Sequence, residues 1–76
     1  MSDASITIAV GIALKSLIKK NYSSQQAFAD DFGVELRTVS RYVTEGIRNV
    51  EVIQEIADFF DMDLIDYLRM AKQLSE

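Results

Sequence analysis

The scarcity of chain-breaking residues is the feature that most restricts how this sequence can fold. The 76 residues include no proline and only three glycines, Gly11, Gly33 and Gly46. Because proline interrupts helices and glycine commonly ends them, such a chain favours helices joined by short turns. A chain of this length forms one small domain, which buries about 60% of its unfolded surface. We therefore expect a single all-α domain over residues 1–76.

Apolar residues recur at three- and four-residue steps in five segments, which predicts helices over residues 8–20, 25–32, 35–45, 50–61 and 64–74. Residues 5–10, "SITIAV", alternate between polar and apolar, so residues 1–9 are either a helical extension or an extended arm. Ser23 or Ser24 is suited to cap the second helix, with Ser23 and Gln26 forming a capping box, and Asn49 is suited to cap the fourth. The expected architecture is a compact five-helix bundle.

Residues 24–46 have the spacing that a helix-turn-helix motif requires. The two helices of such a motif cross steeply over a short turn, so a small residue is needed where the backbones approach, and Ala29 supplies it. Gly33 can adopt the left-handed conformation of a sharp turn. The remaining apolar residues of the motif are expected to fill the wedge between the helices: Phe28, Phe32, Val34, Val39 and Tyr42.

This motif resembles a known family. The stretch "SQQAFADDFGVELRTVSRYVTEG" resembles the helix-turn-helix of the phage repressor and Cro group, also called the xenobiotic-response-element family. The flanking stretches "GIALKSLIKK" and "IQEIADFFDMDLIDYL" are similar to the family's first helix and last two helices, so the resemblance covers about residues 10–68. Two positions depart from it: Thr44 replaces a common glutamate, and the loop after Gly46 lacks a frequent proline.

The resemblance implies a cytoplasmic, bacterial or phage-encoded transcriptional regulator, of the repressor type, that binds double-stranded DNA. The helix at about residues 35–45 would then lie in the major groove. Arginine suits base recognition because its guanidinium can donate to both O6 and N7 of guanine. The base-contact candidates are Glu35, Leu36, Arg37, Ser40 and Arg41. The phosphate-contact candidates are Ser24, Gln25, Thr38, Arg48 and Asn49.

The distribution of charge is compatible with a polyanionic partner, although the net charge is −4. Residues 12–50 carry six basic and four acidic side chains, a net of +2, whereas residues 51–76 carry two basic and seven acidic side chains, a net of −5. The acidity thus lies mainly in the last third. Because DNA would meet the first two thirds, the acidic composition does not exclude DNA binding.

Other functional classes fit the composition poorly. Histidine and cysteine are absent, and the carboxylates are scattered, so we expect no enzyme, cofactor or metal site and no small-molecule ligand. The run of Asp58, Asp61, Asp63 and Asp66 lacks the glycine and terminal glutamate of a calcium loop. The apolar run at residues 6–14 is too short for a bilayer and lacks the pattern of a signal peptide.

Two questions stay open from the sequence. The motif could instead serve as a protein-interaction module, such as an antirepressor or DNA mimic, with the acidic last third as its contact surface. The chain is also expected to form a homodimer or to be part of a longer regulator, because one such domain reads about one half-site. Apolar residues without an evident place in the bundle are Ile6, Ile8, Ile12, Ile65, Tyr67, Met70 and Leu74.

Overall fold

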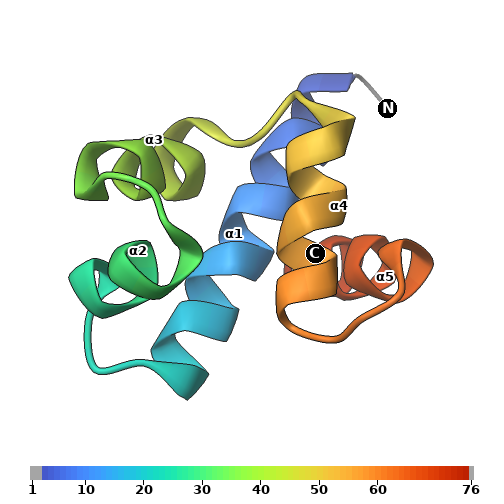
Figure 1. Cartoon of the computed structure of the whole chain (residues 1–76). Helices are drawn as coiled ribbons and strands as arrows, with labels where there is room; N and C mark the ends of the chain where they lie inside the picture. The colour runs from blue at the N-terminus through green and yellow to red at the C-terminus, as the bar shows by residue number, and fades with distance from the viewer. Residues whose placement is uncertain (1–2, 76) are drawn as a thin grey trace.

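The computed structural model describes residues 3–75, with side chains described from residue 6 onward. These residues form five α-helices and no strand, which confirms the prediction of an all-α chain (Figure 1). The molecule measures 33 × 23 × 22 Å along its principal axes. The helices are α1 (Asp3–Asn21), α2 (Gln25–Phe32), α3 (Leu36–Glu45), α4 (Val50–Phe59) and α5 (Leu64–Ser75).

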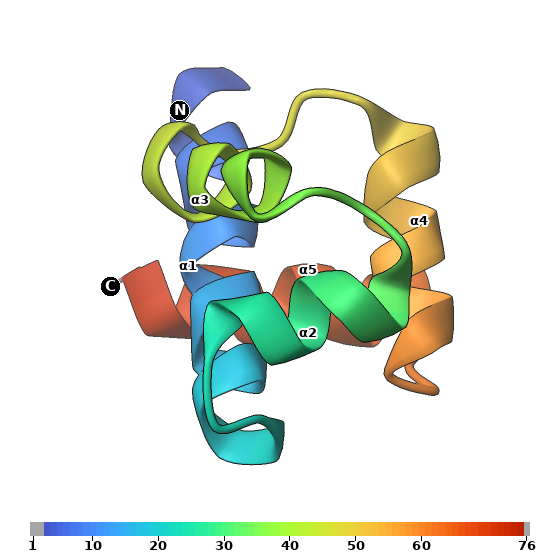
Figure 2. The same cartoon turned by 60° about the vertical axis from the view of Figure 1, so that its left-hand side comes forward.

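Helix α1 runs through the middle of the molecule. Helices α2 and α3 lie on one side of it, and α4 and α5 lie on the other (Figures 1 and 2). Three residues of α1, Val10, Ala13 and Leu14, have no exposed surface, because neighbouring helices cover them. The other fully buried side chains come from four further helices: Phe28, Ala29, Val39, Ile56, Ala57 and Tyr67. One hydrophobic core therefore joins all five helices.

The helix ends follow from local capping, with two differences from the sequence predictions. Ser24 caps α2, since its hydroxyl accepts a hydrogen bond from the Ala27 N–H (N–O 3.1 Å), and Asn49 caps α4 in the same manner through Glu51 N–H (2.9 Å). The predicted Ser23–Gln26 capping box is wrong, because Gln26 donates instead to Asp30 (2.9 Å). Residues 3–7 are helical, so the segment before Ile8 extends α1.

The fourth helix ends two residues earlier than predicted. Its last residue is Phe59, and Asp61 adopts a left-handed conformation with φ of 58°. The N–H of Met62 donates to the carbonyl of Ala57 (2.8 Å), which closes the end of the helix. The chain thereby reverses and begins α5 at Leu64.

Helix α1 approaches the end of α3 unusually closely, and two glycines make this possible. A Cβ atom placed on Gly11 would lie 2.4 Å from the carbonyl oxygen of Tyr42, and one on Gly46 would lie 2.3 Å from that of Thr7. The N–H of Ile47 donates to the same Thr7 oxygen (3.1 Å). Gly46 also has φ of 90° and ψ of −177°, a region that is almost restricted to glycine. The docking of α3 on α1 is thus a backbone-to-backbone contact.

Helix α5 turns a different side toward the core than predicted. Tyr67 was expected on an unused apolar surface, but it is fully buried and its hydroxyl donates to the Val10 carbonyl on α1 (2.8 Å). This burial raises the pKa of Tyr67 well above its ordinary value of 10. Leu68, the next residue along the helix, is 36% exposed. The side of α5 that carries Leu68 faces solvent because Tyr67 takes the core position.

Candidate functional site

The connection between α2 and α3 is short and tightly bonded. Gly33 has φ of 87°, and its N–H and that of Val34 both donate to the carbonyl of Ala29 (2.9 and 3.0 Å). Glu35 is the N-cap residue of α3, and its carbonyl accepts from the Thr38 N–H (3.0 Å). Only three residues therefore separate the two helices.

The predicted scaffold residues of residues 24–46 meet in the core. Phe28, Ala29 and Val39 have no exposed surface, and Phe32, Val34 and Tyr42 pack against them partly buried. The ring of Phe28 also contacts Phe32 and Phe60, with centroids 5.2 and 5.6 Å apart. The position of α3 is consequently fixed by side chains from α2 and by the glycine contacts with α1.

The outward side of α3 carries two arginines four residues apart, Arg37 and Arg41, and both are exposed. The Arg37 Nε lies 4.0 Å from a carboxylate oxygen of Glu35, and both side chains are close to 80% exposed. Such an exposed ion pair is weak, so it leaves Arg37 available to another anion. Leu36, 40% exposed, lies beside them at the start of the helix. Four of the five predicted base-contact residues thus face solvent together.

Ser40, the fifth of these residues, is less exposed than the other four. It is half-buried, and its hydroxyl donates to the side-chain oxygen Oε1 of Gln25 on α2 (3.4 Å). Gln25 is the first residue of α2, so this bond joins the N-terminus of α2 to the middle of α3. Ser40 therefore faces the partner helix, and the sequence spacing alone did not reveal this contact.

Four of the five predicted phosphate-contact residues fall into two pairs. Ser24 and Gln25 lie at the N-terminus of α2, whose first N–H groups carry partial positive charge. Arg48 and Asn49 are exposed in the connection between α3 and α4, with Asn49 already engaged in capping α4. Thr38 is half-buried in the first turn of α3.

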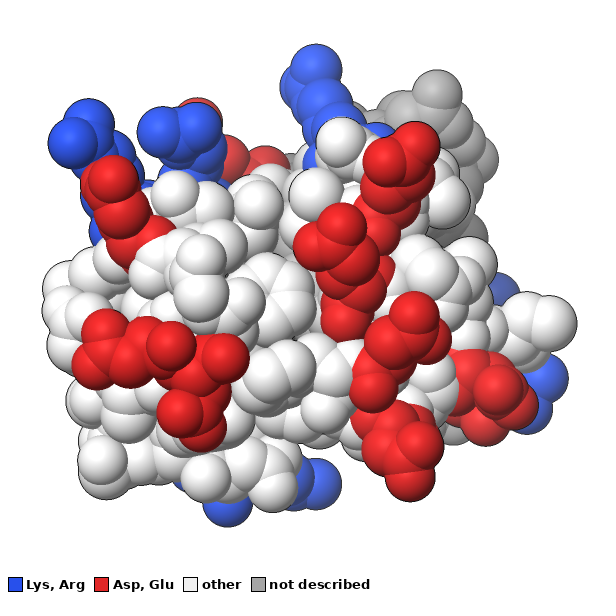
Figure 3. Space-filling model, viewed as in Figure 1, with Lys and Arg blue, Asp and Glu red and all other residues white. Residues whose placement is uncertain are grey.

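Acidic and basic side chains gather in different parts of the surface seen in Figure 3. In the view of Figure 3, basic side chains project from the upper edge, over α3 and the α3–α4 connection, while acidic side chains gather over α4 and its surroundings. A smaller acidic group lies over α2, where Asp30 is bonded to Gln26 and Asp31 accepts from the Tyr22 hydroxyl (3.1 Å). The exposed arginines of α3 are therefore separated from the main acidic surface.

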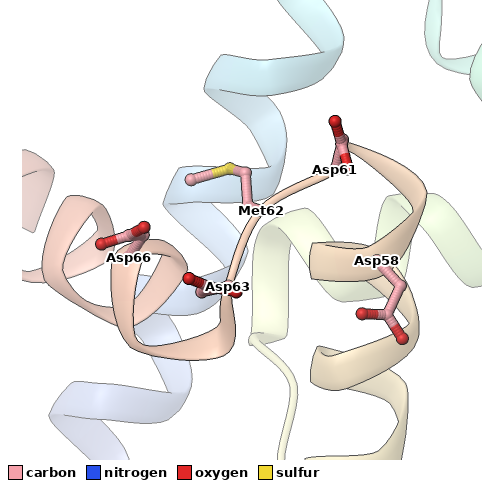
Figure 4. Close-up of a pocket in the computed structure, with 5 residues that line it drawn as sticks. All are labelled: Asp58, Asp61, Met62, Asp63 and Asp66. Atoms are coloured by element: carbon pink, nitrogen blue, oxygen red, sulfur yellow. The ribbon is translucent and has the colours of Figure 1, made fainter.

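The aspartates of the α4–α5 turn do not form a metal site. Asp58, Asp61, Asp63 and Asp66 line a shallow depression of about 320 Å³ together with Met62. Their carboxylates are spread around the turn rather than directed at a common point (Figure 4). Within residues 3–75 no group of three or more potential ligands is arranged to hold a metal ion.

Sequence reasoning missed the role of Gly11, which allows the close approach of α1 and α3. A lone glycine inside an apolar helical pattern is the signal that could have identified this packing role.

Across the described part of the chain, none of the helices has the length and apolar character needed to cross a membrane. Comparison with known proteins found no match among protein families, curated proteins or solved structures.

Proposed function

We propose that this chain is a helix-turn-helix domain that binds double-stranded DNA in a sequence-specific manner, as the DNA-binding part of a transcriptional repressor. In this proposal α2 and α3 are the two helices of the motif, and α3 enters the major groove. The observation that carries the proposal is the exposed pair Arg37 and Arg41 on a helix whose other side is held by α1 and α2. The three-residue turn at Gly33 and the buried Ala29 support the same arrangement.

The roles of the α3 residues follow from their chemistry and exposure. Arg37 and Arg41 would each donate to a guanine edge, and Leu36 would contact a thymine methyl group. Glu35 forms only a weak, exposed ion pair with Arg37, so its carboxylate remains available to another partner. The carboxylate would accept a hydrogen bond from a cytosine amino group, or it would repel phosphates and so set the register of α3 along the DNA.

The residues around α3 would fix the domain on the phosphate backbone. Gln25 stands at the N-terminus of α2, where N–H groups and a helix dipole favour an anion. Because its Oε1 accepts from Ser40, its side-chain NH₂ group remains to donate to a phosphate. Ser24 and Thr38 would assist at this clamp, and Arg48 with Asn49 would form a second one in the next loop.

Selection of bound sequences from a random duplex pool tests the proposal directly. A consensus sequence is expected, with affinity falling by orders of magnitude between about 50 and 200 mM salt, since several phosphates are contacted. Arg37→Ala and Arg41→Ala should each cost about 1–3 kcal/mol of specific binding and leave the helical content unchanged. Lys20→Ala is the matched control, because it removes one exposed positive charge from the last turn of α1, outside α3.

The acidic surface supports one alternative function. If the chain were an antirepressor or DNA mimic, the acidic side chains over α4 (Figure 3) would contact a basic protein surface. In that case α3 would not bind DNA. Failure to retain random or genomic duplex even at low salt would reject the DNA-binding proposal and favour this alternative.

A further inference from the structure

Glu35 is an acidic residue at the start of the helix that carries the exposed arginines, and the fold does not require a glutamate there. It is the N-cap residue of α3, but its side chain makes no capping hydrogen bond. Only its backbone carbonyl serves the helix, by accepting from the N–H groups of Thr38 and Val39 (3.0 and 3.3 Å). The side chain itself is 79% exposed. Its carboxylate is therefore available for a role outside the folded chain.

The side chains of Glu35 and Arg37 place an acceptor beside a pair of donors. The Arg37 Nε lies 4.0 Å from the Glu35 Oε2. Because this contact lies on the Nε side of the guanidinium, its two terminal NH₂ groups remain to donate as a fork. The carboxylate keeps its second oxygen, Oε1, as an acceptor. Together the two side chains offer two donors and one acceptor.

We propose that Glu35 and Arg37 jointly read one G·C base pair, with the fork of Arg37 on guanine and the carboxylate of Glu35 on the cytosine paired with it. This inference rests on the proposed function, because it assigns a base pair to residues of the same α3 surface. In the major groove, guanine presents the acceptors N7 and O6, and its cytosine presents the donor N4. This pattern is the complement of the one that the two side chains offer.

A carboxylate at the base edges has few suitable partners, and cytosine is the best of them. Guanine N7 and O6 and thymine O4 are acceptors, which repel a carboxylate, whereas cytosine and adenine each carry an amino donor. The amino group of adenine lies beside the acceptor N7, so adenine suits an amide side chain better than a carboxylate. A carboxylate that loses its water without gaining a donor is strongly destabilising. Glu35 therefore selects cytosine.

The ion pair couples the two contacts. It is weak in solvent, but the attraction between its charges strengthens where the groove displaces water. Arg37 bound to guanine then directs its Nε–H at Glu35 and holds the carboxylate beside the cytosine. The order of the two side chains along α3 is fixed, so a base pair with guanine and cytosine exchanged between the strands places each side chain against the wrong group. The pair thus distinguishes G·C from C·G as well as from A·T.

Selection of bound sequences from a random duplex pool, with the full chain and single-residue variants, tests the inference. Glu35→Ala and Arg37→Ala should each lose about tenfold discrimination at the same G·C base pair, whereas Arg41→Ala should relax a different position. Glu45→Ala is the matched control, because Glu45 is an exposed acid at the other end of α3. It removes the same charge and should leave every base preference unchanged.

A modified duplex tests the contact with the amino group itself. Methylation of cytosine at N4 replaces the hydrogen that faces the major groove and keeps the base pair with guanine. On the selected site, this change should weaken binding of the original chain about tenfold and should not weaken binding of Glu35→Ala any further. Circular dichroism of each variant checks that the fold is retained.

The outcomes separate this inference from the proposed function. If the original chain enriches no sequence, both are rejected. If it enriches a sequence but Glu35→Ala and Arg37→Ala relax different base pairs, only the joint reading is rejected. The joint reading also fails if Glu35→Ala and Glu45→Ala raise the affinity for every sequence alike, since Glu35 then only repels phosphates. Equal weakening of the original chain and Glu35→Ala by N4 methylation rejects it as well.

Discussion

Replacement of Gly11 by alanine should destabilise the protein, although the same change in an ordinary helix would stabilise it. Alanine in a helix interior is favoured over glycine by about 1 kcal/mol. At Gly11, however, the new methyl carbon would lie 2.4 Å from the Tyr42 carbonyl oxygen and 3.1 Å from the Gly46 Cα. Both neighbours are backbone atoms, so no side chain can rotate away, and α1 and α3 must separate.

The cost of this separation can be worked from the contacts that it breaks. Overpacking of a well-packed region costs about 1–3 kcal/mol. Moving α3 away also stretches the hydrogen bond from Ile47 N–H to the Thr7 carbonyl (3.1 Å), worth about 0.5–1.5 kcal/mol. After subtraction of the helix-propensity gain, Gly11→Ala should lower the free energy of unfolding by about 1–3 kcal/mol. This is a large share of the about 4–11 kcal/mol expected for a chain of this length.

Urea unfolding followed by far-UV circular dichroism measures this difference. Ser16→Ala is the control, since Ser16 lies on the same helix, is half-buried and should change stability by no more than about 0.5 kcal/mol. A Gly11→Ala variant that is as stable as the original chain, or more stable, would show that α1 and α3 are not in backbone contact.

Two further predictions concern hydrogen bonds between helices. Ser40→Ala should weaken DNA binding by about 0.5–1.5 kcal/mol, because it removes the hydrogen bond that positions Gln25. The same substitution should therefore have little additional effect in a Gln25→Ala background. If the two effects were fully additive in a double-mutant cycle, Ser40 would contact DNA directly. Burial raises the pKa of Tyr67 in the folded state, so its hydroxyl stays neutral there. Its contribution to stability is therefore complete below about pH 10, the ordinary pKa of tyrosine in the unfolded chain. Above that pH the free energy of unfolding falls by about 1.4 kcal/mol per pH unit. Tyr67→Phe should be less stable at neutral pH and lack this part of the alkaline decline, as urea unfolding between about pH 8 and 11 would reveal.

Elements whose limits depend on local chemistry could be predicted from the sequence. The bounds of α2 agree with the prediction, because Ser24 caps one end and Gly33 closes the other. The predicted start of α3 differs by one residue, since Glu35 acts as its N-cap and not as its first helical residue. The early end of α4 was missed because Phe59 and Phe60 continue the apolar pattern, and nothing in it marks the left-handed Asp61.

Features that depend on distant parts of the chain could not be predicted. Tyr67 bonds to a carbonyl 57 residues away, and its spacing on α5 fits a core stripe as well as a surface one. The bond between Ser40 and Gln25 depends likewise on how α2 and α3 cross. The arginines of α3 were identified correctly as exposed, because the outward side of a short amphipathic helix follows from its own periodicity.

Helix α1 positions α3, because its Thr7 and Gly11 contact the end of that helix. Two recognition helices must lie about 34 Å apart to read successive major grooves. When two copies bind one duplex, a separation of α1 and α3 caused by Gly11→Ala would shift both α3 helices away from this spacing. The variant should weaken binding to a duplex with two half-sites more than binding to a single half-site.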